Sequence, residues 1–200
     1  SAAAAAATLK RVLTILKTLV TQVDVLETMT PLSFNAFRDR LETSSGFQSG
    51  QFRALEFLLG HKRPALVSQH PEASTVRAEL EALLTEPSIW DCFVRHLHRL
   101  GCVMPDAALH RDPAAATVAD AAVQSQLIAV YQRYPYSAQL CELLVDLDEG
   151  MQEWRYRHVK MVERTIGAKL GTGGSAGMAY LRETLFRPLF PDLWAIRTQL

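Results

Sequence analysis

The sequence predicts an all-α protein, a helical bundle arranged around one long helix. Apolar residues recur at steps of three and four along most of the chain, which is the spacing of one helix face, while strand-like alternation is scarce. Glycines follow the last apolar residue of three such stretches, at Gly60, Gly101 and Gly167, as expected at helix C-termini. With 200 residues, of which 48% are hydrophobic, the chain is long enough to bury the core of one domain.

Three helices are expected in the first third of the chain. The first covers residues 9–26, with leucines and valines on one face. Thr30 and Pro31 start the second as N-cap and first helical residue, and a serine–glycine turn ends it. The third covers residues 47–59 and stops at Gly60.

The remaining two thirds are expected to hold further helices, separated by loops and followed by an irregular tail. Prolines at positions 188 and 191 are expected to disrupt that tail. The expected helices cover residues 72–84, 88–100, 114–134 (with Thr117 as an alternative start), 137–166 and 178–185. The expected loops cover residues 61–71 and 104–113.

Charge and hydropathy argue against two classes of partner. Basic and acidic residues number 21 each, and no long basic run is present, which argues against nucleic acid or an anionic membrane as the main partner. No apolar stretch has the length needed to span a bilayer.

The cysteines and the first residues indicate a cytoplasmic protein. Cys92, Cys102 and Cys141 are too few and too widely spaced for a disulfide framework or a metal quartet, and a reducing cytosol is the simplest compartment. Residues 1–7, a serine and six alanines, lack the charged and apolar regions of a signal peptide. We expect them to be a tag, a linker or placeholder residues, and residues 8–200 to form a single domain.

A lone histidine, His158, interrupts the apolar face of the longest expected helix. Such a residue is more often a core histidine whose ring nitrogens find backbone partners, but a free nitrogen is also a ready metal ligand. One protein ligand cannot hold a bare zinc ion, whereas it can hold a haem iron that already has four nitrogens. The face contains Leu140, Leu144, Leu147, Met151, Trp154, His158, Met161 and Thr165.

Two more features could bind a small molecule. Arg38 shares a helix face with Phe34 and Leu41, so it is either a snorkelling surface arginine or a planar fork for a carboxylate beside an apolar wall. The glycine-rich segment 171–175 is either a flexible connector or an anion-binding loop. Within it, the Thr172 hydroxyl could bind an ammonium and a carboxylate group.

These segments together resemble the tryptophan 2,3-dioxygenase family. The resemblance extends from about residue 9 to the end of the chain and is weakest between residues 61 and 133. The strings that carry it are LETMTPLSF (26–34), FR (37–38), SGFQS (45–49), WRYRHV (154–159) with its continuation to residue 167, GTGGS (171–175) and YLR (180–182).

The resemblance implies the bundle of the haem dioxygenases, an all-helical, cytosolic and homotetrameric fold with one haem b per subunit, ferrous in the active state. It implies insertion of O₂ into the indole C2–C3 bond of L-tryptophan to give N-formyl-L-kynurenine, the first step of tryptophan catabolism. Because both oxygen atoms enter the product, no electron-donating cofactor is needed. The absence of a GxGxxG motif agrees with this.

Six residues match family site positions. His158 matches the axial ligand of the haem iron, Arg38 the arginine that pairs with the substrate carboxylate, and Thr172 the threonine near the substrate ammonium and carboxylate. Phe34 matches a pocket position, and Ser45 and Gly46 match the turn over the haem edge.

The family also has a helical segment before the first helix, with a histidine on the distal side of the haem. Residues 1–10 do not match it, and no histidine precedes His61. We therefore expect the distal segment to be missing and assign no distal catalytic residue. Two alternatives to the enzyme stay open: a non-catalytic haem- or indole-binding relic or truncated, inactive form, and a haem-free helical interaction domain.

Overall fold

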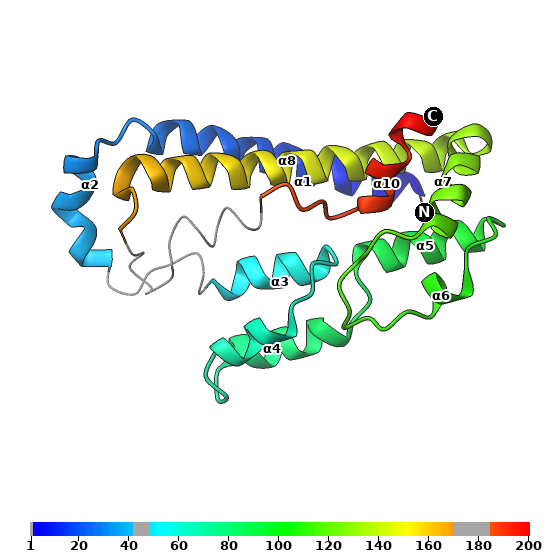
Figure 1. Cartoon of the computed structure of the whole chain (residues 1–200), viewed down its shortest axis with the longest axis horizontal. Coiled ribbons are helices and arrows are strands. Elements are labelled where there is room, and N and C mark those ends of the chain that lie inside the picture. Colours follow the sequence, from blue (N-terminus) through cyan, green and yellow to red (C-terminus); the bar gives the residue numbers. More distant parts are fainter. Residues whose placement is uncertain (1, 42–48, 170–184) are drawn as a thin grey trace. The chain divides into compact units, whose positions relative to one another are not determined.

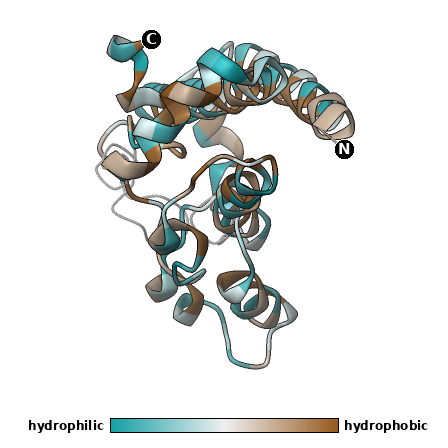
Figure 2. Ribbon diagram, turned by 90° about the vertical axis from the view of Figure 1, so that its right-hand side faces the viewer, coloured by the Kyte–Doolittle hydropathy of each residue, from teal (hydrophilic) through white to brown (hydrophobic). Residues whose placement is uncertain are grey.

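The computed structural model describes residues 2–41, 49–169 and 185–200. Every regular element within these ranges is an α-helix or a short 3-10 helix, which confirms the all-α prediction (Figure 1). Polar and apolar residues share each helix, the pattern of amphipathic helices that cover a core with one face (Figure 2).

The chain divides into two compact units. Unit 1 comprises residues 3–48 and 146–188, and unit 2 comprises residues 49–145 and 189–200. The long helix α8 (Pro135–Ile166) contributes its first turns to unit 2 and its remaining turns to unit 1. The single-domain organisation expected from the sequence stays a prediction.

Unit 1 contains α1 (Ala2–Leu26), α2 (Pro31–Arg38), the 3-10 helix η1 (Asp39–Leu41) and most of α8. The prediction that the first helix starts at residue 9 is wrong, because α1 already begins at Ala2. Alanine has the highest intrinsic helix propensity, and neither proline nor glycine interrupts the run. That residues 1–7 are a tag or linker stays a prediction.

Helix α1 packs with residues spaced seven apart. Leu9, Leu16 and Val23 are its buried residues, a spacing that keeps one narrow seam against a neighbouring helix. Gly150 of α8 lies at this seam, where a Cβ atom would be only 2.8 Å from the Leu16 Cδ2 atom. The missing side chain at Gly150 therefore gives Leu16 its space.

The start of α2 follows the sequence prediction. The Thr30 hydroxyl accepts a hydrogen bond from the Ser33 amide at 3.1 Å, and Pro31 occupies the first turn. The α-helix ends at Arg38 and the chain continues as η1 to Leu41.

Unit 2 contains short helices and the first turns of α8. They are α3 (Gly50–Leu58), η3 (Pro64–Gln69), α4 (Thr75–Thr85), α5 (Ile89–Arg99), α6 (Asp106–Leu109), α7 (Ala121–Arg133), the first turns of α8, α10 (Pro191–Ala195) and η4 (Arg197–Gln199). The largest fully buried side chains of this unit include Phe57, Leu80, Leu97, Leu127, Leu144, Phe190, Leu193 and Ile196.

The predicted helix over residues 114–134 starts too early. The helix α7 begins at Ala121, with the Asp120 side chain accepting hydrogen bonds from the amides of the first turn. The preceding backbone is hydrogen-bonded elsewhere: Arg111 donates to the carbonyls of Ala115 and Ala116, and the Thr117 amide donates to the Gly60 carbonyl. These tertiary bonds replace helical ones in this segment.

Three further expectations also differ from the structure. The expected loops 61–71 and 104–113 contain η3 and α6, and the expected irregular tail contains α10. Pro191 is the first residue of α10, where a proline loses no helical hydrogen bond. The helix expected over residues 178–185 lies outside the described residues, except for its last position.

Candidate functional site

The predicted apolar face of α8 changes in exposure along its length. Leu140, Leu144, Leu147 and Met151 are at most 4% exposed, whereas Trp154, His158, Met161 and Thr165 are all partly exposed. In the second half the buried residues are instead Arg155 and Val159, one position further along the helix. His158, which the sequence left open as a core residue or a metal ligand, is therefore partly exposed.

The His158 ring is held by an aromatic neighbour. It stacks on Trp154, one turn earlier, with ring centroids 5.6 Å apart and an interplanar angle of 12°. Burial lowers the pKa of His158 below its ordinary value of 6.5, which favours the neutral imidazole. No residue in the described part of the chain hydrogen-bonds to either ring nitrogen, so a nitrogen lone pair is available to a ligand.

The described residues contain no group of three or more His, Cys, Asp and Glu side chains that could hold a metal ion. The donor set at His158 is thus one neutral nitrogen beside an aromatic wall. Such a donor suits an iron that arrives with its own equatorial nitrogens, and in this respect His158 fits a haem.

The residue before His158 joins α8 to the end of α1. Arg157 Nε and Nη2 donate to the two carboxylate oxygens of Glu27 at 3.1 and 2.9 Å, and Nη2 also donates to Asp24. Together with the contact between Gly150 and Leu16, this shows that α1 and α8 run parallel (Figure 1). The end of α1, and α2 after it, therefore lie toward the same end of unit 1 as the C-terminal turns of α8.

Helix α2 presents two phenylalanines and an arginine. The rings of Phe34 and Phe37 meet edge to face, with centroids 5.3 Å apart and an interplanar angle of 76°. Both rings and Arg38 are partly exposed. The T-shaped pair gives a rigid apolar wall, and Arg38 is the last residue of the same short helix.

Unit 1 thus contains three of the predicted site residues: His158 on α8, and Phe34 and Arg38 on α2. Thr172, Ser45 and Gly46 lie outside the described residues. Their predicted roles, and those of the three described residues, stay predictions.

Sequence reasoning missed Arg157 as a residue that holds this region together. The acidic signal was present, because Asp24 and Glu27 stand three apart on one face of α1. Their partner is 130 or more positions away in the chain, so only the fold brings it to them.

These observations define a class: an all-helical protein with one neutral, partly exposed imidazole on its longest helix. Among the described residues, the structure contains no helix with the length and hydropathy of a membrane span.

The chain belongs to the tryptophan 2,3-dioxygenase family. The family model described as tryptophan 2,3-dioxygenase matches residues 3–98 and 105–200, which confirms the resemblance.

Curated relatives agree. A tryptophan 2,3-dioxygenase of Herpetosiphon aurantiacus is 58% identical over 192 residues, covering 96% of this chain and 73% of the relative. One from Anaeromyxobacter sp. (strain K) is 55% identical over 198 residues, covering 96% and 72%. One from Caulobacter vibrioides is 48% identical over 180 residues, covering 88% and 68%.

Proposed function

We propose that this chain catalyses the oxygenation of L-tryptophan by O₂, opening the indole C2–C3 bond to give N-formyl-L-kynurenine. The observation that carries the proposal is the family match over nearly the whole chain, with relatives named tryptophan 2,3-dioxygenase at up to 58% identity. Nothing in the structure or in these relatives favours an inactive relic.

The proposed cofactor is haem b, with His158 as its axial protein ligand. The support is the ring itself: a partly exposed imidazole, stacked on Trp154, with no hydrogen-bond partner among the described residues. Bound haem iron would supply the activation of O₂. The stacking with Trp154 fixes the ring orientation, so the lone pair is presented in one direction.

The proposed substrate contacts come from α2. Arg38 would pair with the tryptophan carboxylate through two N–H groups, each such charge-assisted bond contributing about 1.5–3 kcal/mol. Phe34, fixed against Phe37, would face the apolar part of the substrate. Holding both ends of the amino acid positions its indole for reaction, which is an entropic contribution to rate.

Three further contacts are proposed on family resemblance. Thr172 would bind near the substrate ammonium and carboxylate, while Ser45 and Gly46 would lie against the haem edge. A homotetramer in the cytoplasm is proposed on the same ground. Sedimentation velocity tests the assembly, since a mass other than four chains contradicts it.

The test of the function combines a spectrum with an assay. Purified protein loaded with haem and reduced should convert L-tryptophan and O₂ to N-formyl-L-kynurenine. The variant His158→Ala should lose the Soret band and the activity, while His98→Ala, a matched change at an exposed histidine of α5, should retain both.

Two results would contradict parts of this proposal separately. An unchanged Soret band in His158→Ala removes the ligand role of His158. Full haem binding by the unaltered chain without any product removes the dioxygenase activity and leaves a haem-binding protein.

A further inference from the structure

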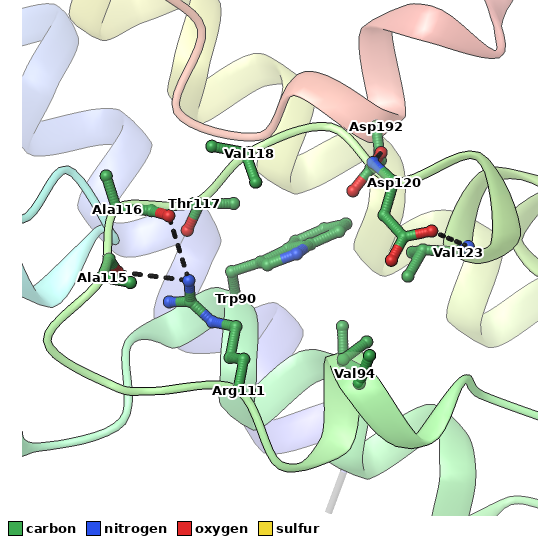
Figure 3. Close-up of a pocket in the computed structure, with 12 residues that line it drawn as sticks. Trp90, Val94, Arg111, Ala115, Ala116, Thr117, Val118, Asp120, Val123 and Asp192 are labelled. Carbon is green, nitrogen blue, oxygen red and sulfur yellow. Dashed lines mark hydrogen bonds between the residues drawn. The ribbon is translucent and has the colours of Figure 1, made fainter.

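Unit 2 contains a cavity of about 190 Å³ that the proposed function does not use. It is lined by residues of α5, α6, the segment before α7, α7 and α10, and the indole of Trp90 lies among the other lining side chains (Figure 3). Most of its wall is apolar and includes Val94, Val118 and Val123. An apolar cavity of about 150 Å³ can hold benzene, so this one has room for a molecule of similar size.

Two of the charged residues in the wall already have partners. The guanidinium of Arg111 is ion-paired with Asp91 and donates to the carbonyls of Ala115 and Ala116 at 3.2 Å each. The Asp120 carboxylate accepts from the first-turn amides of α7. Neither of these two charged groups therefore requires a bound ligand as a hydrogen-bond partner.

Asp192 differs from these residues. It is 1% exposed, and its Oδ1 atom accepts hydrogen bonds from the Asp120 amide at 2.7 Å and from Gln124 Nε2 at 2.9 Å. Its Oδ2 atom is buried and has no hydrogen-bond partner within the described residues. Figure 3 shows this carboxylate beside the Trp90 indole, at the wall of the cavity.

A buried carboxylate oxygen without a donor is costly, and burial raises the pKa of Asp192 accordingly. The cost falls when a cation or an N–H group donates to the oxygen. The local charge points to a cation, because Asp120 and Asp192 are adjacent acids while Arg111 is neutralised by Asp91. The face of an indole also attracts organic cations.

We propose that this cavity binds a small organic ammonium ion with an apolar body. The ammonium donates to Asp192 Oδ2, and the body packs against Trp90 and the valines. The volume limits the ligand to about the size of a benzene ring with a one-carbon amine arm. The proposal does not depend on the haem or on the tryptophan site, since every residue that lines the cavity belongs to unit 2.

The test is calorimetric titration of the whole chain with benzylamine, which is an ammonium ion at pH 7, and with benzyl alcohol as its neutral counterpart of nearly equal shape. We expect benzylamine to bind at least tenfold more tightly than benzyl alcohol. The Trp90 indole N–H resonance, assigned with Trp90→Phe, should shift on binding. Equal affinity for the two compounds, or no binding of benzylamine at millimolar concentration, overturns the proposal.

Two variants locate the site. Asp192→Asn keeps an oxygen for Asp120 and Gln124 but places an N–H₂ donor where Oδ2 was, so benzylamine affinity should fall at least tenfold. Unchanged affinity overturns the role of Asp192. Should that variant fail to fold, Val94→Leu decides, because its extra methylene group occupies the cavity and should weaken binding at least threefold. Undiminished binding in a folded Val94→Leu protein overturns the site.

Discussion

The two halves of α8 carry the same apolar spacing, yet the face with this spacing is buried only in the first half. In the first half, Leu140, Leu144, Leu147 and Met151 are almost completely covered. In the second half, positions of the same pattern, such as His158 and Met161, are partly exposed. Periodicity identifies a helix face, but it does not say whether the same chain covers that face.

This difference in burial between the two halves of α8 bears on where a ligand could bind. A face that is apolar in sequence and partly open in the structure is suited to a ligand with a large flat apolar surface. The stripe of that open half contains an imidazole, His158, whereas the stripe of the buried half contains only leucines and a methionine. The comparison therefore separates residues that stabilise the fold from residues proposed to hold a cofactor.

The largest expected effect is on stability in the buried half. Leu144→Ala removes a side chain that is 2% exposed and should lower the free energy of unfolding by about 2–5 kcal/mol. The matched change in the open half, Met161→Ala, should cost under about 1 kcal/mol, because partly exposed side chains leave no closed cavity.

Urea denaturation of the haem-free chain measures both values, because bound haem would add its own stabilisation. Equal losses in the two variants would show that the open half is covered in solution. That result would remove the distinction between the two halves.

The next largest effect is expected on tryptophan binding, when Arg38, the residue proposed to bind the substrate carboxylate, is replaced. Arg38→Leu removes both charged hydrogen bonds to the tryptophan carboxylate and should raise KM by roughly ten- to a hundredfold, since 1.4 kcal/mol corresponds to a factor of ten. Steady-state kinetics and equilibrium binding of tryptophan measure it. Arg40→Leu, an exposed arginine in η1, is the control and should leave KM unchanged. An unaffected KM in Arg38→Leu removes the carboxylate-binding role.

The sequence was sufficient for the helices whose signals are local. Thr30 and Pro31 predicted the start of α2, and Gly60 and Gly101 follow α3 and α5 with positive φ angles of 93° and 92°. It was insufficient where distant residues decide. The non-helical backbone before α7 is held by Arg111 and by Gly60, and no local pattern shows those bonds.

The residues of the candidate site show the same difference between local sequence signals and contacts made by distant residues. His158, Arg38 and Phe34 were found from spacing and family resemblance, and the structure assigns all three to unit 1. The unpartnered oxygen of Asp192 could not be found in that way, because its burial depends on segments about 70 residues apart in the chain. Pro191 before it even suggested an irregular tail.

A smaller effect on the free energy of unfolding is expected when the charge of the buried residue Asp91 is removed. Burial alone would raise the Asp91 pKa, but hydrogen bonds from Arg111 and Ser88 outweigh it and hold the pKa below its ordinary value of 3.8. A carboxyl whose folded pKa is lowered stabilises the fold above its unfolded pKa, and this stabilisation disappears as the pH falls through the folded value.

Asp91→Asn should therefore cost about 1.5 kcal/mol at pH 7, and the difference from the unaltered chain should shrink below about pH 4. Urea denaturation at a series of pH values measures this. A difference that stays constant down to pH 2 would mean that the Asp91 charge does not contribute.

The smallest effect on stability is expected from the ion pairs that Arg157 of α8 forms with Asp24 and Glu27 at the end of α1. Arg157 is 25% exposed at its side chain and Asp24 is 59% exposed, so solvent screens their ion pair. Arg157→Met should cost under about 1 kcal/mol of stability, less at high salt, and the double variant with Glu27→Gln should cost no more than Arg157→Met alone. If the increase in tryptophan KM, converted to free energy, exceeds the loss in the free energy of unfolding, this link aligns α2 with His158. Equal, small changes in both would mean that packing at Leu16 and Gly150 already sets the register of the two helices, leaving the ion pair as a minor addition.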